Sequence, residues 1–261
     1  MPVLRIGGSV SIWAIADIHA SRTDPETGRP VKPMSIFGER WEDHLGRIES
    51  AWSQLVAAED TVIVAGDTDW ALHFEDAMET LTRIDTWPGR KVLLRGNHDY
   101  WWSSKSTSKV RQHLAPSLTA LHNNAVQAEG FNICGAKGSP VPGGADWTEH
   151  DAKLLNRERE RLLLSLKERD ASLPTIVALH FPPFYAGNPD TVYREVLEGT
   201  PVACCVYGHL HGAAASTGFQ GRYGRVEYRL VAADALAFRP ALIATHHTLV
   251  APEKAATSAK E

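Results

Sequence analysis

The chain has 261 residues, of which 43% are hydrophobic and 22% charged, and its formal net charge is −4. These values are ordinary for a globular protein and give no overall positive field, so neither nucleic acid nor an anionic membrane surface is expected as a partner. No apolar run approaches the roughly 18 residues of a membrane-spanning helix. The opening residues, MPVLRIGGSV, lack the long apolar core of a signal peptide. Three cysteines without a CxxC spacing favour a reducing compartment, and we expect a cytoplasmic protein.

Apolar β-type runs alternate with amphipathic stretches along the chain. The predicted strands are residues 11–17, 61–67, 91–97, 175–180 and 202–209, and the predicted helices are residues 41–60, 74–84 and 151–170. Strands that alternate with helices are typical of an α/β fold with a layered sheet. Residues 225–245 look strand-rich, and residues 20–40, rich in proline, glycine and charge, are expected to form a long functional loop. We expect one domain over residues 1–250 and a flexible tail at 251–261.

Polar side chains follow each of the five predicted strands, where the strand ends. The set is Asp17, His19, Asp67, Asn97, His180, His209 and His211. Functional groups gather outside the carboxyl ends of strands in open α/β sheets, and residues i and i+2 of an extended chain point to the same side. Carboxylate, amide and imidazole ligands suit manganese, iron, zinc, cobalt or nickel better than calcium or magnesium. Seven such side chains are too many for one ion and about right for two.

The order of these motifs resembles the calcineurin-like metallophosphoesterase superfamily. The motifs are DxH at 17–19, GD at 66–67, GNHD at 96–99, a single histidine at 180 and GHxH at 208–211. The resemblance implies an α/β (α+β) four-layer sandwich, with two packed mixed β-sheets flanked by helices and two divalent metal ions at the sheet ends. The pieces KPMSIFG, GDTDWA and GNHDYWW further resemble a bacterial branch of predicted phosphohydrolases, which brings no known substrate.

The resemblance also implies which residues hold each ion. One ion would be held by Asp17, His19, Asp67 and His211, and the other by Asp67, Asn97, His180 and His209. Manganese is the metal we expect first, with iron, zinc, cobalt or nickel as alternatives. Many family members carry a second aspartate three positions after that of the GD motif; here that position is Trp70, and Asp69 precedes it.

Two ions of this kind can clamp a phosphoryl group and activate water for in-line attack. By the resemblance, His98 assists the leaving group, and we expect Asp99 to orient His98. The predicted activity is hydrolysis of a small-molecule or nucleotide phosphate ester, as a monoester or diester. A metal-dependent nuclease is the alternative, although no basic stripe supports it, and a non-catalytic scaffold is a third possibility.

Several other residues have both a functional and a structural interpretation. Asn97, His98, Trp101 and Lys137 are candidate substrate contacts. Trp101 and Trp102 either form an aromatic wall for a substrate or anchor the GNHD loop in the core, and we favour the core for at least one of them. Lys32, Trp41 and Arg157 are weaker candidates. The remaining histidines, at 44, 73, 113, 122, 150, 246 and 247, are interpreted as surface or helix residues.

Overall fold

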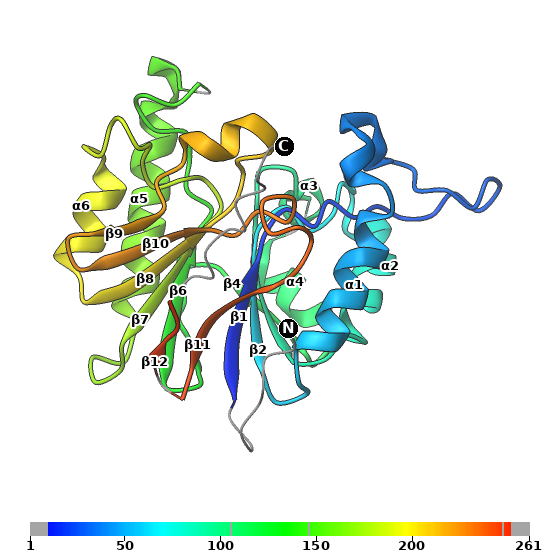
Figure 1. Cartoon of the computed structure of the whole chain (residues 1–261), viewed down its shortest axis with the longest axis horizontal. Coiled ribbons are helices and arrows are strands. Elements are labelled where there is room, and N and C mark those ends of the chain that lie inside the picture. The colour runs from blue at the N-terminus through cyan, green and yellow to red at the C-terminus, as the bar shows by residue number, and fades with distance from the viewer. Residues whose placement is uncertain (1–9, 105, 146, 247, 252–261) are drawn as a thin grey trace, which may run out of the picture.

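Two mixed β-sheets form the centre of the protein (Figure 1). The structure is a computed structural model that describes residues 10–251, with the exception of 105, 146 and 247. Within these residues each sheet has six strands, in the orders β12-β11-β1-β2-β3-β4 and β5-β6-β7-β8-β10-β9. The first sheet contains β1 (Ser11–Ile15), β2 (Thr61–Ala65), β3 (Arg90–Leu94), β4 (Leu118–Leu121), β11 (Ala241–Thr245) and β12 (Thr248–Leu249). The second contains β5 (Val126–Ala128), β6 (Phe131–Ala136), β7 (Thr175–Leu179), β8 (Val202–Tyr207), β9 (Gly221–Tyr223) and β10 (Val226–Leu230).

Parallel strands occupy the middle of both sheets. Strands β1 to β4 run parallel in the first sheet, and β6, β7, β8 and β10 run parallel in the second. Antiparallel strands close the edges: β11 pairs with β1, β5 with β6 and β9 with β10. Because the central strands are parallel, their carboxyl ends lie at one end of each sheet, which is where the polar motifs follow.

Helices cover the outer face of each sheet and complete four layers (Figure 1). α1 (His44–Leu55) and α2 (Phe74–Asp85) cover the first sheet, and α5 (Ala152–Lys167) and α6 (Val192–Gly199) cover the second. The shorter helices are α3 (Tyr100–Ser103), α4 (Thr107–His113), η1 (Met34–Phe37), η2 (Glu39–Trp41), η3 (Glu149–Asp151) and η4 (Gly212–Thr217). The predicted fold class, two mixed sheets flanked by helices, is confirmed.

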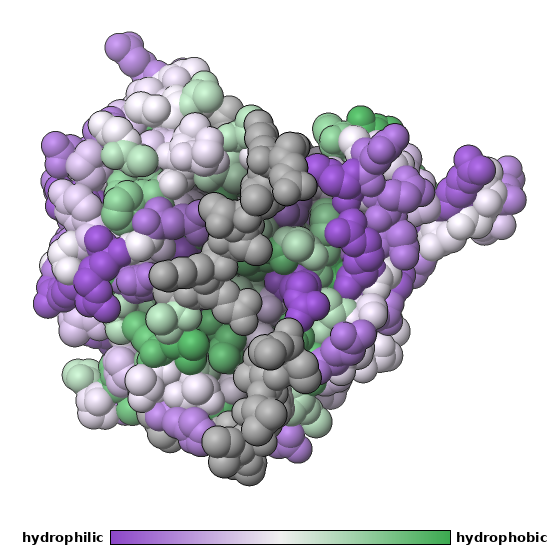
Figure 2. All heavy atoms as spheres, viewed as in Figure 1, coloured by the Kyte–Doolittle hydropathy of each residue, from purple (hydrophilic) through white to green (hydrophobic). Residues whose placement is uncertain are grey.

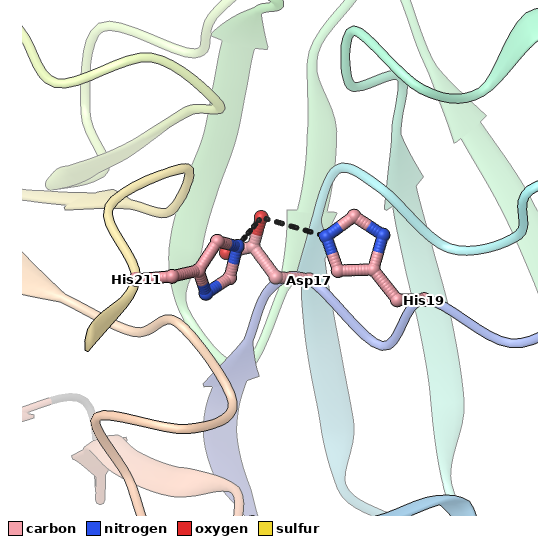
Figure 3. Close-up of side chains that lie close together, drawn as sticks. All are labelled: Asp17, His19 and His211. Atoms are coloured by element: carbon pink, nitrogen blue, oxygen red, sulfur yellow. Dashed lines mark ion pairs between the residues drawn. The ribbon is translucent and has the colours of Figure 1, made fainter. Parts of the chain in front are cut away.

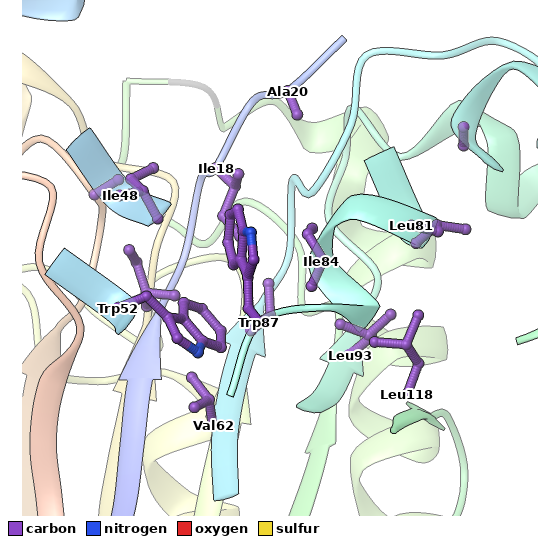
Figure 4. Close-up of a cluster of buried hydrophobic side chains, with 14 of the residues drawn as sticks. Ile18, Ala20, Ile48, Trp52, Val62, Leu81, Ile84, Trp87, Leu93 and Leu118 are labelled. Carbon is purple, nitrogen blue, oxygen red and sulfur yellow. The ribbon is translucent and has the colours of Figure 1, made fainter. Parts of the chain in front are cut away.

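Alternation along the strands separates three hydrophobic clusters. On β1, Ile12 and Ala14 belong to the cluster between the sheets, whereas Trp13 and Ile15 belong to the cluster beneath α1 and α2. Figure 4 shows the latter cluster, where Trp52 from α1 lies among apolar side chains from β2, β3 and α2. A third cluster packs α5 and α6 onto the second sheet. Every residue of β1 is buried, because the strand lies between helices and the other sheet.

The structure refines several predicted elements. The first helix starts at His44 rather than at 41, and residues 20–40 contain η1 and the beginning of η2. The strand-rich region at 225–245 divides into β10 and β11, which belong to different sheets. Of the expected tail, only residue 251 is described, and 252–261 lie outside the described residues. None of the described helices is long and apolar enough to cross a membrane.

Candidate metal centre

The turns after β1 and β2 run side by side and carry three of the predicted ligands. The backbone N–H of Asp17 donates to Gly66 O at 2.9 Å, and that of His19 donates to Asp67 O at 2.9 Å. Asp17, His19 and Asp67 all have positive φ values, of 60°, 48° and 54°. Such conformations are costly for residues other than glycine, and they are concentrated at functional sites. The sharp turns aim the side chains into one space beyond the strand ends.

Two positions in the motifs require glycine, because an aspartate side chain approaches each of them closely. A Cβ atom added to Gly208 would lie 2.5 Å from Asp17 Oδ2, and one added to Gly96 would overlap the carboxylate of Asp67. Each glycine therefore makes room for a carboxylate from a neighbouring strand end. This is the physical reason for the glycine before His209 and for the one before Asn97.

One group of ligand atoms gathers Asp17, His19 and His211, as Figure 3 shows. Their ligand atoms all lie within 4.8 Å of one another. Asp17 Oδ1 is 3.3 Å from His211 Nε2 and 4.0 Å from His19 Nε2. The imidazoles lie on either side of the Asp17 carboxylate, and this geometry allows all three side chains to reach one ion.

A second group, Asp17, Asp67 and His180, shares Asp17 with the first, and Asp67 lies close to histidines of both groups. His180 Nε2 is 3.3 Å from Asp67 Oδ2 and 2.6 Å from Asn97 Oδ1, and His209 Nδ1 is 3.0 Å from the same Asn97 oxygen. Asp67 Oδ2 also lies 3.8 Å from His19 Nε2. The structure thus brings all seven predicted side chains together, with Asp67 between histidines of the two groups.

The charges of this cluster favour a bound cation. Burial opposes ionisation of Asp17, but His211 and His180 outweigh it and lower the pKa of Asp17. Burial likewise opposes a charge on His180, but Asp67 and Asp17 outweigh it and raise the pKa of His180 to about 9. Two buried carboxylates therefore hold a proton on a neighbouring imidazole. Metal binding replaces such protons, because imidazole ligates in its neutral form. The donor set and its charge thus fit divalent metal ions.

Side chains behind the ligands fix their orientation. His211 Nδ1 is 2.9 Å from Asp234 Oδ1, and the other Asp234 oxygen accepts a hydrogen bond from Gly212 N at 3.0 Å. The Asp234 side chain is fully buried and forms an ion pair with Arg40. A carboxylate behind a ligating imidazole fixes its tautomer and raises its basicity. No motif in the sequence pointed to Asp234, which follows β10 in an unremarkable run, VAADALAF.

Asp99 does not have the partner expected for it. Its carboxylate is fully buried and accepts five hydrogen bonds: from the backbone N–H groups of Asp67, Thr68, Asp69 and Gly96 at 2.7–3.2 Å, and from Trp101 Nε1 at 2.9 Å. Both oxygens are thereby occupied in joining the turn after β2 to the turn after β3. The expectation that Asp99 orients His98 is corrected accordingly: His98 Nδ1 lies 3.4 Å from Tyr100 Oη instead.

One of the four candidate substrate contacts lies in the core. Trp101 is 0% exposed and Trp102 is 2% exposed, so both belong to the core, and Trp101 has no surface to offer a substrate. Lys137 is partly buried, with its Nζ 5.3 Å from the centre of the Phe181 ring, and that ring lies 4.2 Å from the ring of the predicted ligand His209. Asn97 and His98 remain at the centre. The core interpretation holds for both tryptophans.

A cavity of about 300 Å³ opens directly onto the first group of ligands. It is lined by His19, Met34, Phe37, Arg40, Trp41, Trp70, His98, His211 and Gly212. Trp70, which stands where many relatives have aspartate, stacks on His19 with ring centres 4.7 Å apart and lies 4.2 Å from the ring of His98. Asp69 turns the other way and accepts hydrogen bonds from Thr80 Oγ1 and Ala71 N, at 2.5 and 2.6 Å.

A two-sheet sandwich with histidine and aspartate side chains gathered at its strand ends defines a class of metal-dependent hydrolases. The model of the calcineurin-like phosphoesterase family matches residues 10–213, and the chain belongs to this family. It is therefore a phosphoester hydrolase of a metal-dependent family, with candidate metal ligands in place.

Two solved structures are similar to this chain at low sequence identity. A phosphopantetheinyl hydrolase from Mycobacterium tuberculosis is 16% identical, with a TM-score of 0.51 over 87% of this chain and 90% of that one. A protein of unknown function from Aquifex aeolicus is 17% identical, with a TM-score of 0.44 over 88% of this chain and 94% of that one. No curated protein matches the sequence.

Proposed function

We propose that the protein is a dinuclear metal-dependent phosphohydrolase that cleaves a small phosphate ester. The observation that carries this proposal is the position of Asp67, whose Oδ2 lies 3.8 Å from His19 Nε2 and 3.3 Å from His180 Nε2. A carboxylate between two histidine groups is the arrangement expected of a ligand shared by two ions. Asp17, His19, Asp67 and His211 would hold one ion, and Asp67, Asn97, His180 and His209 the other.

The ions, when bound, would supply Lewis acidity toward the phosphoryl oxygens and activate a water molecule as the nucleophile. Side chains of the protein would position the phosphate and assist the leaving group. Asn97 Oδ1 lies within 3.0 Å of His180 and His209, and the backbone N–H of His98 donates to Asp67 Oδ1 at 2.8 Å, which holds His98 beside the centre. Burial lowers the pKa of His98, whereas Asp67 and Asp17 oppose this shift and favour the protonated imidazole, the form that can pass a proton to a leaving group. We assign His98 to the leaving-group oxygen.

Manganese is the metal we propose, because mixed carboxylate, amide and imidazole ligands suit it, and iron, zinc, cobalt and nickel share the same ligand preferences. The substrate is a monoester or a diester, since the same centre serves both. The net charge of −4 gives the nuclease alternative no support. Ligands from both sheets also favour one domain over residues 1–250, and three buried free cysteines favour the cytoplasm.

The direct test compares wild type with His98→Ala on phenyl phosphate and diphenyl phosphate in manganese, because phenolate, unlike p-nitrophenolate, is basic enough to benefit from a donated proton. We expect wild-type turnover, and a loss of about 10²–10⁴-fold in the variant, because proton donation typically contributes that much. The metal content, measured on both proteins, should be the same. The ratio of the two wild-type rates distinguishes a monoesterase from a diesterase. Equal rates for wild type and variant would remove His98 from the mechanism, and a metal-free, folded wild type would favour the scaffold alternative.

A further inference from the structure

The cavity above the metal centre has aromatic and apolar walls. Trp41, Trp70 and Phe37 contribute rings, and Met34 contributes a thioether. Met34 and Phe37 come from η1, in the segment expected to be a long loop, Trp41 ends η2, and Trp70 follows β2. The cavity walls are thus built by a segment separate from the strand ends that carry the proposed ligands.

The two indoles are held firmly in place. Trp70 Nε1 lies 3.3 Å from Met34 Sδ, which joins the turn after β2 to η1. Trp41 is only 4% exposed, with its ring centre 5.5 Å from that of His211 and 5.1 Å from that of Phe238. The rings therefore form a preorganised surface beside His98, the residue that we assign to the leaving-group oxygen.

Phe37 differs from the indoles, because it lines the cavity and is still 61% exposed. Its neighbour Ile36 is 73% exposed but does not line the cavity. Figure 2 shows the hydrophobic surface that η1 presents next to strongly hydrophilic surface. An exposed apolar side chain at the mouth of a site has area available for a ligand to cover.

Apart from His19, His98 and His211 of the centre, the polar side chain in the cavity lining is Arg40, which forms an ion pair with the buried carboxylate of Asp234. A sugar hydroxyl placed against indole, phenyl and thioether groups would lose its hydrogen bonds to water without replacement, which is unfavourable. A flat aromatic group would instead cover ring faces and gain offset-stacked or edge contacts.

We propose that this cavity binds the leaving group of the substrate, and that the substrate is a phosphate ester of an aromatic alcohol rather than of a sugar. The inference rests on the proposed phosphohydrolase function and specifies its substrate class. Trp70 and Trp41 form fixed walls of the subsite, and the exposed Phe37 offers further apolar area to the bound ring. The aromatic wall for which Trp101 and Trp102 were candidates is thus assigned to other rings.

The experiment compares 1-naphthyl phosphate with phenyl phosphate, whose leaving groups have similar basicity but different apolar area. Wild type, Phe37→Ala and Ile36→Ala are assayed in manganese for kcat/KM on both substrates. We expect wild type to favour the naphthyl ester, and Phe37→Ala to lower this preference by about 3–10-fold, since apolar pockets discriminate on this scale. Ile36→Ala, the matched exposed neighbour, should keep the wild-type ratio.

Binding provides a second measurement that needs no turnover. Calorimetry with 1-naphthylphosphonate and phenylphosphonate should give the same preference in Kd, reduced by Phe37→Ala and kept by Ile36→Ala. Wild type that hydrolyses both esters without preferring naphthyl, or a preference equal in all three proteins, would overturn the aromatic subsite and leave the proposed function intact. Wild type that hydrolyses neither ester nor any other phosphate ester in a panel would count against the proposed function itself.

Discussion

His211 is oriented by a side chain 23 positions further along the chain. Asp234 accepts from Gly212 N, pairs with Arg40 and lies 2.9 Å from His211 Nδ1. Because Arg40 also lines the cavity, this one carboxylate joins the proposed substrate subsite to the proposed metal centre. Asp234 acts through His211 and is a positioning residue.

We expect Asp234→Asn to weaken manganese binding by about 10–100-fold, which is the usual cost of losing a carboxylate behind a metal-ligating histidine. Titration calorimetry of the two proteins measures this. Asp190→Asn is the matched control, because Asp190 is an 85% exposed aspartate that pairs with Arg194 on the surface. Equal manganese affinity in wild type and Asp234→Asn would show that Asp234 has no influence on the centre.

Residue types and their spacing were enough to predict which seven side chains lie together. They were not enough to predict the partners of Asp99. A carboxylate next to His98 in sequence can point toward the imidazole or, as here, toward backbone N–H groups of the adjoining turns. Trp70 and Asp234 were missed for a related reason. Asp234 follows no motif, Trp70 was noted only as a departure beside the GD motif, and only the tertiary fold brings Trp70 against His19 and Asp234 against His211.

At the scale of elements, local patterns predicted the strands that precede the motifs and the three long helices. They did not reveal β4, β5 or β6, of which β4 and β5 have only four and three residues. The pairing of β11 with β1 joins residues more than 200 positions apart, and no periodicity encodes such a partner. The positive φ values of Asp17, His19 and Asp67 likewise depend on neighbouring strand ends rather than on local preference.

His122, at the end of β4, gives a prediction about acid stability. Burial, then Arg161, Arg111 and Arg95, lower its pKa to about 4. The unfolded chain takes up this proton near pH 6.5, whereas the folded chain does so only near pH 4. The contribution of the neutral His122 side chain to the unfolding free energy is therefore fully present above pH 6.5, and it is lost as the pH falls toward 4. Between pH 7 and 4.5 the unfolding free energy of wild type should fall by about 1–2 kcal/mol more than that of His122→Asn, after allowance for partial solvent screening.

Urea unfolding of both proteins at several pH values measures this difference. The curves of unfolding free energy against pH should diverge below pH 6.5, with wild type losing stability faster. Parallel curves through this range would contradict the assigned environment of His122.

At the scale of the whole molecule, the candidate centre spans both sheets. Asp17, Asp67 and Asn97 follow strands of the first sheet, and His180, His209 and His211 follow strands of the second. An ion bound by both sets would connect the two sheets at one end, and only the folded chain assembles such a site. The motifs in the sequence predicted the two-sheet sandwich. The contacts that stabilise the sandwich could be identified only from the structure.

Metal binding should therefore stabilise the fold. At manganese concentrations about 100-fold above Kd, linkage predicts about 2.7 kcal/mol for one site. For a chain of this size, that gain should raise Tm by about 5–10 °C. Differential scanning calorimetry with and without manganese measures the shift, and excess chelator should reverse it. A Tm that is independent of manganese would indicate that the cluster does not bind the ion in the folded state.

The most direct test of the central claim is the number of metal ions per chain. Wild type and Asp67→Ala would be dialysed to equilibrium against manganese and analysed by elemental mass spectrometry, with circular dichroism to establish that both are folded. We predict two ions per wild-type chain and at most one tightly held ion in Asp67→Ala, because Asp67 is the proposed shared ligand. One ion or none in folded wild type, or two in both proteins, would contradict a dinuclear centre bridged by Asp67.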